Sequence, residues 1–129
     1  MRDIEFRGKD IKTGEWRVGG FTYDAANNPR ITTKDPSGEG LLFHLVIPET
    51  VGQYTGLKDK NGVEIFEGDI VKICYNDRFI NGEIMFINGC FAFVGKIHLA
   101  MENLSEKSWE VIGNIHENPK LLGDKGGAT

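Results

Sequence analysis

The sequence predicts a mainly β protein in which short antiparallel strands form a small barrel or sandwich, with at most one short helix. The first observation behind this prediction is that Asn-Gly pairs recur between apolar stretches, at residues 61–62, 81–82 and 88–89. Asn-Gly is a strong short-range signal for a hairpin because both residues tolerate positive φ. The second observation is the glycine content, 17 residues in 129, which is typical of many tight turns.

The length of 129 residues is that of one ordinary domain, long enough to bury a core without disulfides or a structural metal. Hydrophobic residues make up 40% and charged residues 26%, the balance of a soluble globular chain. We expect a single domain over residues 1–122, with a hairpin and loop region at 1–47 and a barrel-like region at 48–122. Residues 123–129 contain no apolar anchor, and we expect a disordered tail there.

The N-terminal segment predicts a β-hairpin. Ile4 and Phe6 alternate with charged residues, which is the period of a half-buried strand. Residues 12–15 form a turn sequence in which Gly14 can take positive φ, and Trp16 begins the return strand. The pair at residues 19–20, Gly-Gly, predicts a bulge in that strand.

Residues 25–40 are the most loop-like part of the chain, rich in Asn, Pro, Ser and Gly, and only Ile31 offers a core contact there. A mobile loop and the tip of a long hairpin are both consistent with this composition. The apolar run Leu41–Ile47 follows and ends at Pro48. A continuous run of this length predicts a strand that is buried on both faces.

Strands are expected next at a close, regular spacing. The segment from Phe66 onward resembles the opening of an SH3-like barrel. The only helix that the sequence supports lies within residues 98–110, where Leu99, Met101 and Leu104 form an apolar stripe; a loop is the alternative there. The expected strands are Glu64–Phe66, Ile70–Tyr75, Gly82–Ile87, Cys90–Val94 and Trp109–Ile115.

Cys74 and Cys90 lie in apolar runs, which favours two reduced thiols in the core. A disulfide would require the two to flank one hairpin. The N-terminus has no apolar signal-peptide core, and no apolar run approaches the ~20 residues that span a bilayer. We therefore expect an intracellular, cytoplasmic protein with no membrane partner.

Catalytic constellations are not recognisable in the sequence. The glycines match no phosphate-binding loop, and His44, His98 and His116 are isolated from one another and from both cysteines. We therefore expect no cofactor, no metal, no catalytic residue and no small-molecule substrate, and predict that the chain is not an enzyme.

The carboxylates Glu64, Glu67 and Asp69 are the best candidates for the alternative, a metal-dependent enzyme. A turn is the simpler interpretation, because Gly68 permits tight backbone geometry and Asp69 can accept hydrogen bonds from nearby backbone amides.

A second alternative is a nucleic-acid-binding module built on an SH3-like or OB-like barrel. The residues Phe79, Phe86, Phe91, Phe93 and Trp109 would then be a stacking platform. The nearby cations are Lys72, Arg78 and Lys96, the net charge is -4 and the pI about 5.4, which is little positive charge for phosphate contacts. Core packing is the favoured role for these aromatic residues.

Two long motifs resemble the YopX-like family of small bacteriophage and prophage proteins. They are TVGQYTGLKDKNGVEIFEGDIV (Thr50–Val71) and EVIGNIHENPKLL (Glu110–Leu122), and RDIEFRGKD (Arg2–Asp10) matches the start of that family. The resemblance implies a β-rich fold over the whole domain, an uncharacterised role, and no catalytic residue that can be transferred to this chain.

The leading hypothesis is a non-enzymatic phage or prophage accessory protein that binds another protein, self-associates, or both. Strand 70–75 is apolar on both faces, and a small sheet of that kind needs a second layer or another subunit. The candidate partner-contact residues are the charged ones in the glycine-rich motif: Lys58, Asp59, Lys60 and Glu67.

Overall fold

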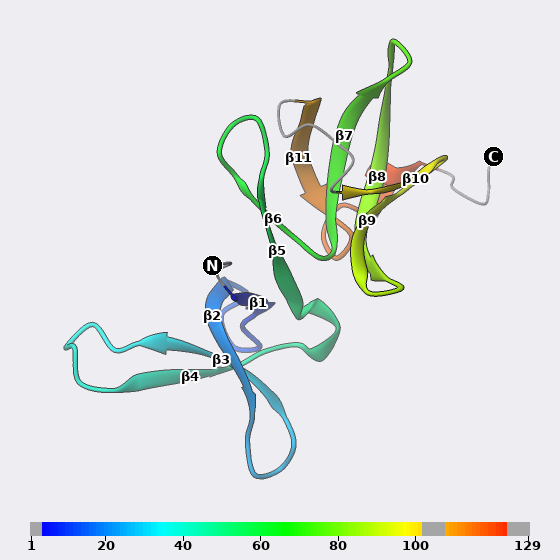
Figure 1. Cartoon of the computed structure of the whole chain (residues 1–129). Coiled ribbons are helices and arrows are strands. Elements are labelled where there is room, and N and C mark those ends of the chain that lie inside the picture. Colours follow the sequence, from blue (N-terminus) through cyan, green and yellow to red (C-terminus); the bar gives the residue numbers. More distant parts are fainter. Residues whose placement is uncertain (1–3, 102–107, 124–129) are drawn as a thin grey trace. The chain divides into compact units, whose positions relative to one another are not determined.

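The computed structural model describes residues 4–101 and 108–123 (Figure 1). The fold is mainly β, as predicted, with two antiparallel sheets and only short 3₁₀ helices in the described ranges. The chain divides into two compact units, Met1–Tyr54 and Thr55–Thr129, which are described separately below. Neither sheet closes into a barrel within the described residues.

The first unit is an antiparallel sheet with the strand order β4-β3-β2-β1-β5. Its strands are β1 (Phe6–Lys9), β2 (Trp16–Tyr23), β3 (Pro29–Lys34), β4 (Leu41–Leu45) and the first part of β5 (Gly52–Lys58), with the 3₁₀ helix η1 (Pro48–Thr50) before β5. The predicted N-terminal hairpin is confirmed as β1 and β2. Its turn is held by Asp10, whose Oδ1 accepts the backbone N–H groups of Lys12 and Thr13.

At Gly19 and Gly20 strand β2 changes its pairing partner. Gly19 lies opposite Phe6 of β1, and Gly20 lies opposite Thr32 of β3, with regular registers on both sides. The predicted bulge was therefore wrong. A Cβ at Gly19 would collide with the carbonyl oxygen of Thr32, so glycine is required there for the close approach of β3.

Residues 25–40 contain strand β3, so of the two alternatives that the sequence left open, the long hairpin is the one found in the structure. Ile31 is fully buried, as the sequence indicated. The prediction that Leu41–Ile47 is buried on both faces was wrong. Leu41, Leu42 and Phe43 are 55%, 38% and 53% exposed, because β4 is the outermost strand of its sheet.

The second unit contains the rest of β5, paired with β6 (Glu64–Phe66), and a five-stranded sheet of order β10-β9-β8-β7-β11. The strands of that sheet are β7 (Asp69–Tyr75), β8 (Arg78–Ile87), β9 (Cys90–Val94), β10 (His98–Ala100) and β11 (Trp109–Asn114), and the 3₁₀ helix η4 (Pro119–Leu122) follows. All five strands predicted here are present.

The predicted helix at 98–110 is not seen at its start, where residues 98–100 form β10. Residues 102–107, and residues 124–129 of the predicted tail, lie outside the described residues.

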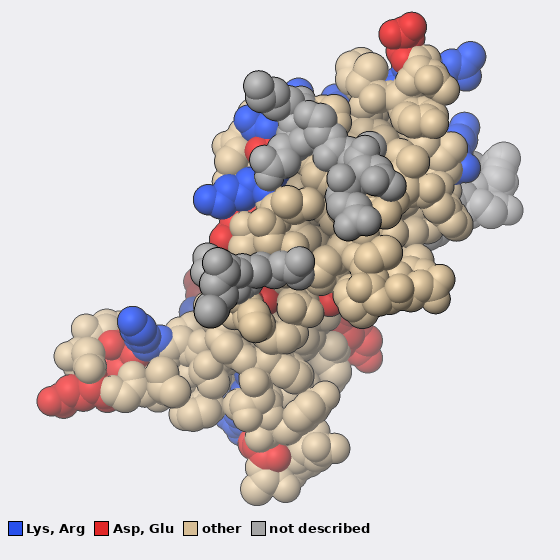
Figure 2. Space-filling view, viewed as in Figure 1, with Lys and Arg blue, Asp and Glu red and all other residues tan. Residues whose placement is uncertain are grey.

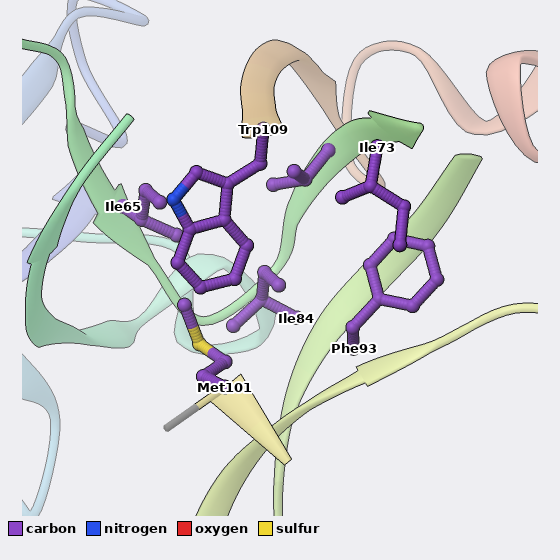
Figure 3. Close-up of a cluster of buried hydrophobic side chains, with 7 residues drawn as sticks. Ile65, Ile73, Ile84, Phe93, Met101 and Trp109 are labelled. Carbon is purple, nitrogen blue, oxygen red and sulfur yellow. The ribbon is translucent and has the colours of Figure 1, made fainter. Parts of the chain in front are cut away.

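Trp109 and Phe93 are the largest side chains in the buried core of the second unit, and both are fully buried (Figure 3). The other members of the cluster are Ile65, Val71, Ile73, Ile84 and Met101. Burying each such side chain contributes about 1.5–3 kcal/mol to folding. These residues come from β6, β7, β8, β9 and β11 and from the end of β10, so the core forms only when the whole sheet is assembled.

The three Asn-Gly pairs have different structural roles. Asn88 and Gly89 form the β8–β9 turn with φ of 52° and 83°, and Gly62 lies in the β5–β6 turn with φ of 82°, as predicted. The pair at residues 81–82 was wrongly predicted to be a turn, since it lies inside β8. A Cβ at Gly82 would be 2.5 Å from Cζ of Phe93, so this glycine makes room for an aromatic ring of the core.

Cys74 and Cys90 are free and exposed, so the prediction of buried core thiols was wrong. Cys74 lies opposite Phe79 and Cys90 opposite Ile87, at the two ends of β8. At 3.3 Å per residue the separation is about 26 Å. That distance excludes a disulfide between the two within one chain.

Candidate functional site

The four predicted contact residues flank the turns before and after β6. Lys58, the last residue of β5, and Lys60 are exposed, and Glu67 is half-buried between β6 and β7. Asp59 is only 5% exposed. The role of these four residues as partner contacts stays a prediction.

The Asp59 carboxylate is engaged by backbone groups from both sides. Its Oδ1 accepts the N–H groups of Asn61 at 2.8 Å and Val63 at 2.9 Å, and its Oδ2 accepts the N–H of Val111 at 2.9 Å. Burial alone would raise the pKa of Asp59, but these hydrogen bonds outweigh it and hold the pKa below its ordinary value. Asp59 therefore fastens the β5–β6 turn to β11.

Glu110 on β11 lies between two lysines. The Nζ atoms of Lys60 and Lys72 are each 3.8 Å from its Oε1. Such partly exposed pairs contribute about 0–1 kcal/mol each. These ion pairs matter more for the charge of the surface than for stability, because Lys72 is paired with the Glu110 carboxylate and is not a free cation.

The carboxylate cluster of Glu64, Glu67 and Asp69 contains a turn acceptor. Oδ2 of Asp69 accepts the N–H of Phe66 at 2.8 Å, and Asp69 is 2% exposed, which confirms the predicted turn role. Gly68 has φ of 89°, as a tight turn requires. Within residues 4–101 and 108–123 no group of three His, Cys, Asp or Glu side chains is placed to hold a metal ion.

The five aromatic residues of the predicted platform separate into buried and exposed members. Phe93 and Trp109 are in the core, and Phe91 packs against it, as expected. Phe79 and Phe86 are 72% and 54% exposed, so core packing was the wrong prediction for these two. Phe86 lies edge-on to Phe91, with ring centroids 5.0 Å apart.

Phe79 lies next to the turn that joins β7 and β8. Asn76 and Asp77 form that two-residue turn with φ of 52° and 64°, the backbone of a tight hairpin. The Nζ of Lys72 is 5.0 Å from the centroid of the Phe79 ring, a cation–π distance. We call Phe79 together with its neighbours Lys72, Tyr75 and Arg78 the hairpin-tip surface.

The sequence named Phe79, Lys72 and Arg78 only within an alternative, and core packing was favoured for Phe79. The reason is that β7 and β8 are apolar runs, and periodicity does not show how far a strand extends beyond its core. The positive-φ pair at residues 76–77, Asn-Asp, was an available signal for the turn. It places Tyr75 and Arg78 opposite each other at the end of the sheet, where both are exposed.

A polar cluster lies on the first unit around Asp10. Its Oδ2 accepts the Nε–H of Arg17 at 3.0 Å and is 3.7 Å from Nδ1 of His44, whose Nε2 is 2.8 Å from Oγ1 of Thr33. The backbone N–H of Lys12 and the Arg17 guanidinium lower the pKa of Asp10 against the opposing effect of burial. Because each member is engaged by its neighbours, this network links the β1–β2 turn to β3 and β4.

No helix within the described ranges has the length and hydropathy of a membrane span.

Comparison with curated protein sequences finds no match for this chain. Among solved structures, the crystal structure of protein EF1440 from Enterococcus faecalis is similar, with 29% identity and a TM-score of 0.59 over 95% of this chain and 99% of that one. Protein yopX from Bacillus subtilis is 17% identical, with a TM-score of 0.62 and full coverage of both chains.

The fold of this chain is thus shared with both of those proteins over nearly their whole length. A family model described as YopX protein matches residues 5–123, a span that includes every strand described above. The chain belongs to the YopX family.

Proposed function

We propose that this chain is a non-enzymatic accessory protein of a phage or prophage that works in the host cytoplasm by binding another protein. The observation that carries the proposal is Phe79, a large aromatic side chain that is 72% exposed on a strand next to a tight turn. Aromatic side chains held on rigid elements are frequent energetic anchors of protein interfaces, because little conformational freedom is lost when they are buried.

The surroundings of Phe79 favour a protein partner with an apolar pocket and a carboxylate at its rim. Lys72 covers one side of the ring and is shared with Glu110. Arg78, the preceding residue of β8, is exposed at the end of the hairpin on the other face of the strand. A guanidinium at that place can form a two-point hydrogen bond with a carboxylate of the partner.

Single-stranded nucleic acid is the second candidate, because an exposed aromatic ring with two cations nearby is how a base is stacked and a phosphate is bound. The charge of the chain weighs against it. The net charge is -4, and Lys72 already contacts Phe79 and Glu110. Arg78 would then be the main phosphate contact of this surface, which is little for salt-dependent binding.

The test is capture from phage-infected host lysate with three tagged baits: the wild-type chain, Phe79→Ser and Val63→Ser. Val63 is the control, since it is 47% exposed in a turn of the same unit. We expect wild type and Val63→Ser to retain the same protein, with and without nuclease, and Phe79→Ser to lose it.

Equal capture by Phe79→Ser would refute the hairpin-tip surface as the binding site. If the captured protein is lost after nuclease treatment, nucleic acid and not a protein would be the direct partner of this chain. A direct binding assay with single-stranded DNA at low and high salt would then show a steep salt dependence.

A further inference from the structure

Strand β4 has an open edge whose backbone groups the sheet does not use. The N–H of Val46 bonds to the carbonyl of Pro29, and the N–H of Asp35 bonds to that of Gly40. In an antiparallel pair, residues alternate between facing the neighbour and facing away. The even-numbered positions of β4 therefore face β3, and the N–H and C=O groups of Leu41 and Phe43 point to the open side.

The open edge ends at Leu45. The carbonyl of Leu45 also points away from β3, but it accepts the N–H of Ile11 at 2.9 Å. No such bond engages the outward groups of Leu41 and Phe43 within residues 4–101 and 108–123. Four backbone groups per chain are thus available for another strand.

The side chains at this edge lack the features that usually protect an edge strand. Natural edges carry lysine, proline, a bulge or an inward-pointing charge that prevents pairing. Leu41, Leu42 and Phe43 carry none of these, and they are exposed on alternating faces of β4. Such an edge is suited to adding a strand from another chain.

We infer that β4 pairs antiparallel with β4 of a second copy of this chain, about a two-fold axis at Leu42. In this register Leu41 of each copy lies opposite Phe43 of the other, and every open N–H meets an open C=O. A two-fold axis at Phe43 would instead place Leu41 opposite Leu45, whose carbonyl is already engaged by Ile11. The Leu42 register is the one that satisfies all the open groups.

Charge and apolar area at the ends of the edge favour a second copy as the partner. The Leu42 register brings Glu39 of one copy opposite Leu45 of the other, and so toward its Ile11–Lys12 segment. Glu39 and Lys12 are exposed charges of opposite sign, and Ile11 is 53% exposed. Figure 2 shows acidic and basic side chains near the end of the β3–β4 hairpin. The two-fold axis repeats each of these contacts.

This inference goes beyond the proposed function, because it concerns self-association through a surface of the first unit that does not include Phe79. The test uses sedimentation velocity of the full chain from micromolar to hundreds of micromolar concentrations. The variants Leu42→Lys and Leu42→Glu each place like charges opposite one another across the two-fold axis, which destabilises a strand pair.

We expect a wild-type dimer, each Leu42 variant alone as a monomer, and an equimolar mixture of the two variants as a heterodimer. Val63→Lys, an exposed position of the other unit, is the control and should dimerise as wild type does. A wild-type monomer at every concentration would overturn the inference. So would a mixture of the variants that stays monomeric while circular dichroism shows both variants folded.

Hydrogen exchange on the wild-type chain tests the same register without any substitution. The amides of Leu41 and Phe43 should become protected as the concentration rises, because they enter hydrogen bonds in the dimer. Unchanged exchange in a dimer would place the interface elsewhere and overturn the inference. If the wild-type chain is a monomer and still captures a partner through Phe79, only the inference is overturned. If it is a dimer and the Phe79→Ser variant captures the partner as well as wild type does, only the proposed binding site is overturned.

Discussion

The carboxylate of Asp59 accepts the backbone N–H of Val111 at 2.9 Å, across 52 positions of sequence. The same carboxylate closes its own turn through Asn61 and Val63. One buried acidic group thus holds two distant segments of the second unit together.

Replacing Asp59 with alanine should lower the free energy of unfolding by roughly 1–3 kcal/mol, because buried N–H groups lose their acceptor. Asn should cost less than Ala, since its amide keeps one acceptor oxygen. Urea unfolding monitored by tryptophan fluorescence measures the change. Lys96→Ala, at an exposed position of the same unit, is the control, and an equally large loss in that variant would contradict the role of Asp59.

The stability of the chain should fall in acid. The pKa values of Asp59 and Asp10 are lowered in the folded state from the ordinary value of 3.8. Groups with a lowered folded pKa stabilise the fold above their unfolded pKa, and this contribution is lost as the pH falls through the folded value. The free energy of unfolding should therefore be flat between about pH 5 and 6 and decline below about pH 4.

The variant Asp59→Asn checks the assignment of that decline. Its unfolding free energy should depend less steeply on pH below 4 than that of wild type, because one of the carboxylates whose pKa is lowered by folding is absent. Identical slopes in urea titrations at matched pH would show that Asp59 does not contribute.

Gly82→Ala should destabilise the second unit by about 1–3 kcal/mol, because the added methyl group would overlap the buried ring of Phe93. The double variant Gly82→Ala with Phe93→Leu tests this cause. The smaller side chain leaves room for the methyl group, so the two effects should be less than additive. Strict additivity in thermal unfolding would mean that the ring is not what the methyl group meets.

Both cysteines should react with a maleimide in the native protein, because both are exposed. Mass spectrometry of the labelled protein should show two additions without denaturant, and no disulfide within the chain after mild oxidation. A thiol that labels only in urea would contradict its exposed position.

The sequence predicted elements whose determinants are local. Asp69 follows Gly68 in a tight turn and accepts a hydrogen bond from Phe66, only three residues away. The turn at Asn88 and the strands on either side of it are encoded in the same way. The family resemblance was also correct, because it rested on long motifs in the matched segment.

The features that the sequence did not predict depend on residues far along the chain. Gly82 follows Asn as Gly89 does, but the ring of Phe93 determines its role. Leu41–Leu45 has the composition of a buried strand, and only the strand order places it at an edge. Phe79 and Cys74 are apolar residues whose exposure depends on how far the β7–β8 hairpin extends past its core.

The change of partner at Gly19 and Gly20 has a consequence for how members of this family can diverge. β3 pairs with the second half of β2, the first half of β2 pairs with β1, and the base of the β3–β4 hairpin contacts the β1–β2 turn through His44 and Leu45. Insertions or deletions at the tip of that hairpin leave the β1–β2 register intact. The hairpin is thus a module whose length and edge residues can change under selection while the strands that carry it keep their pairing.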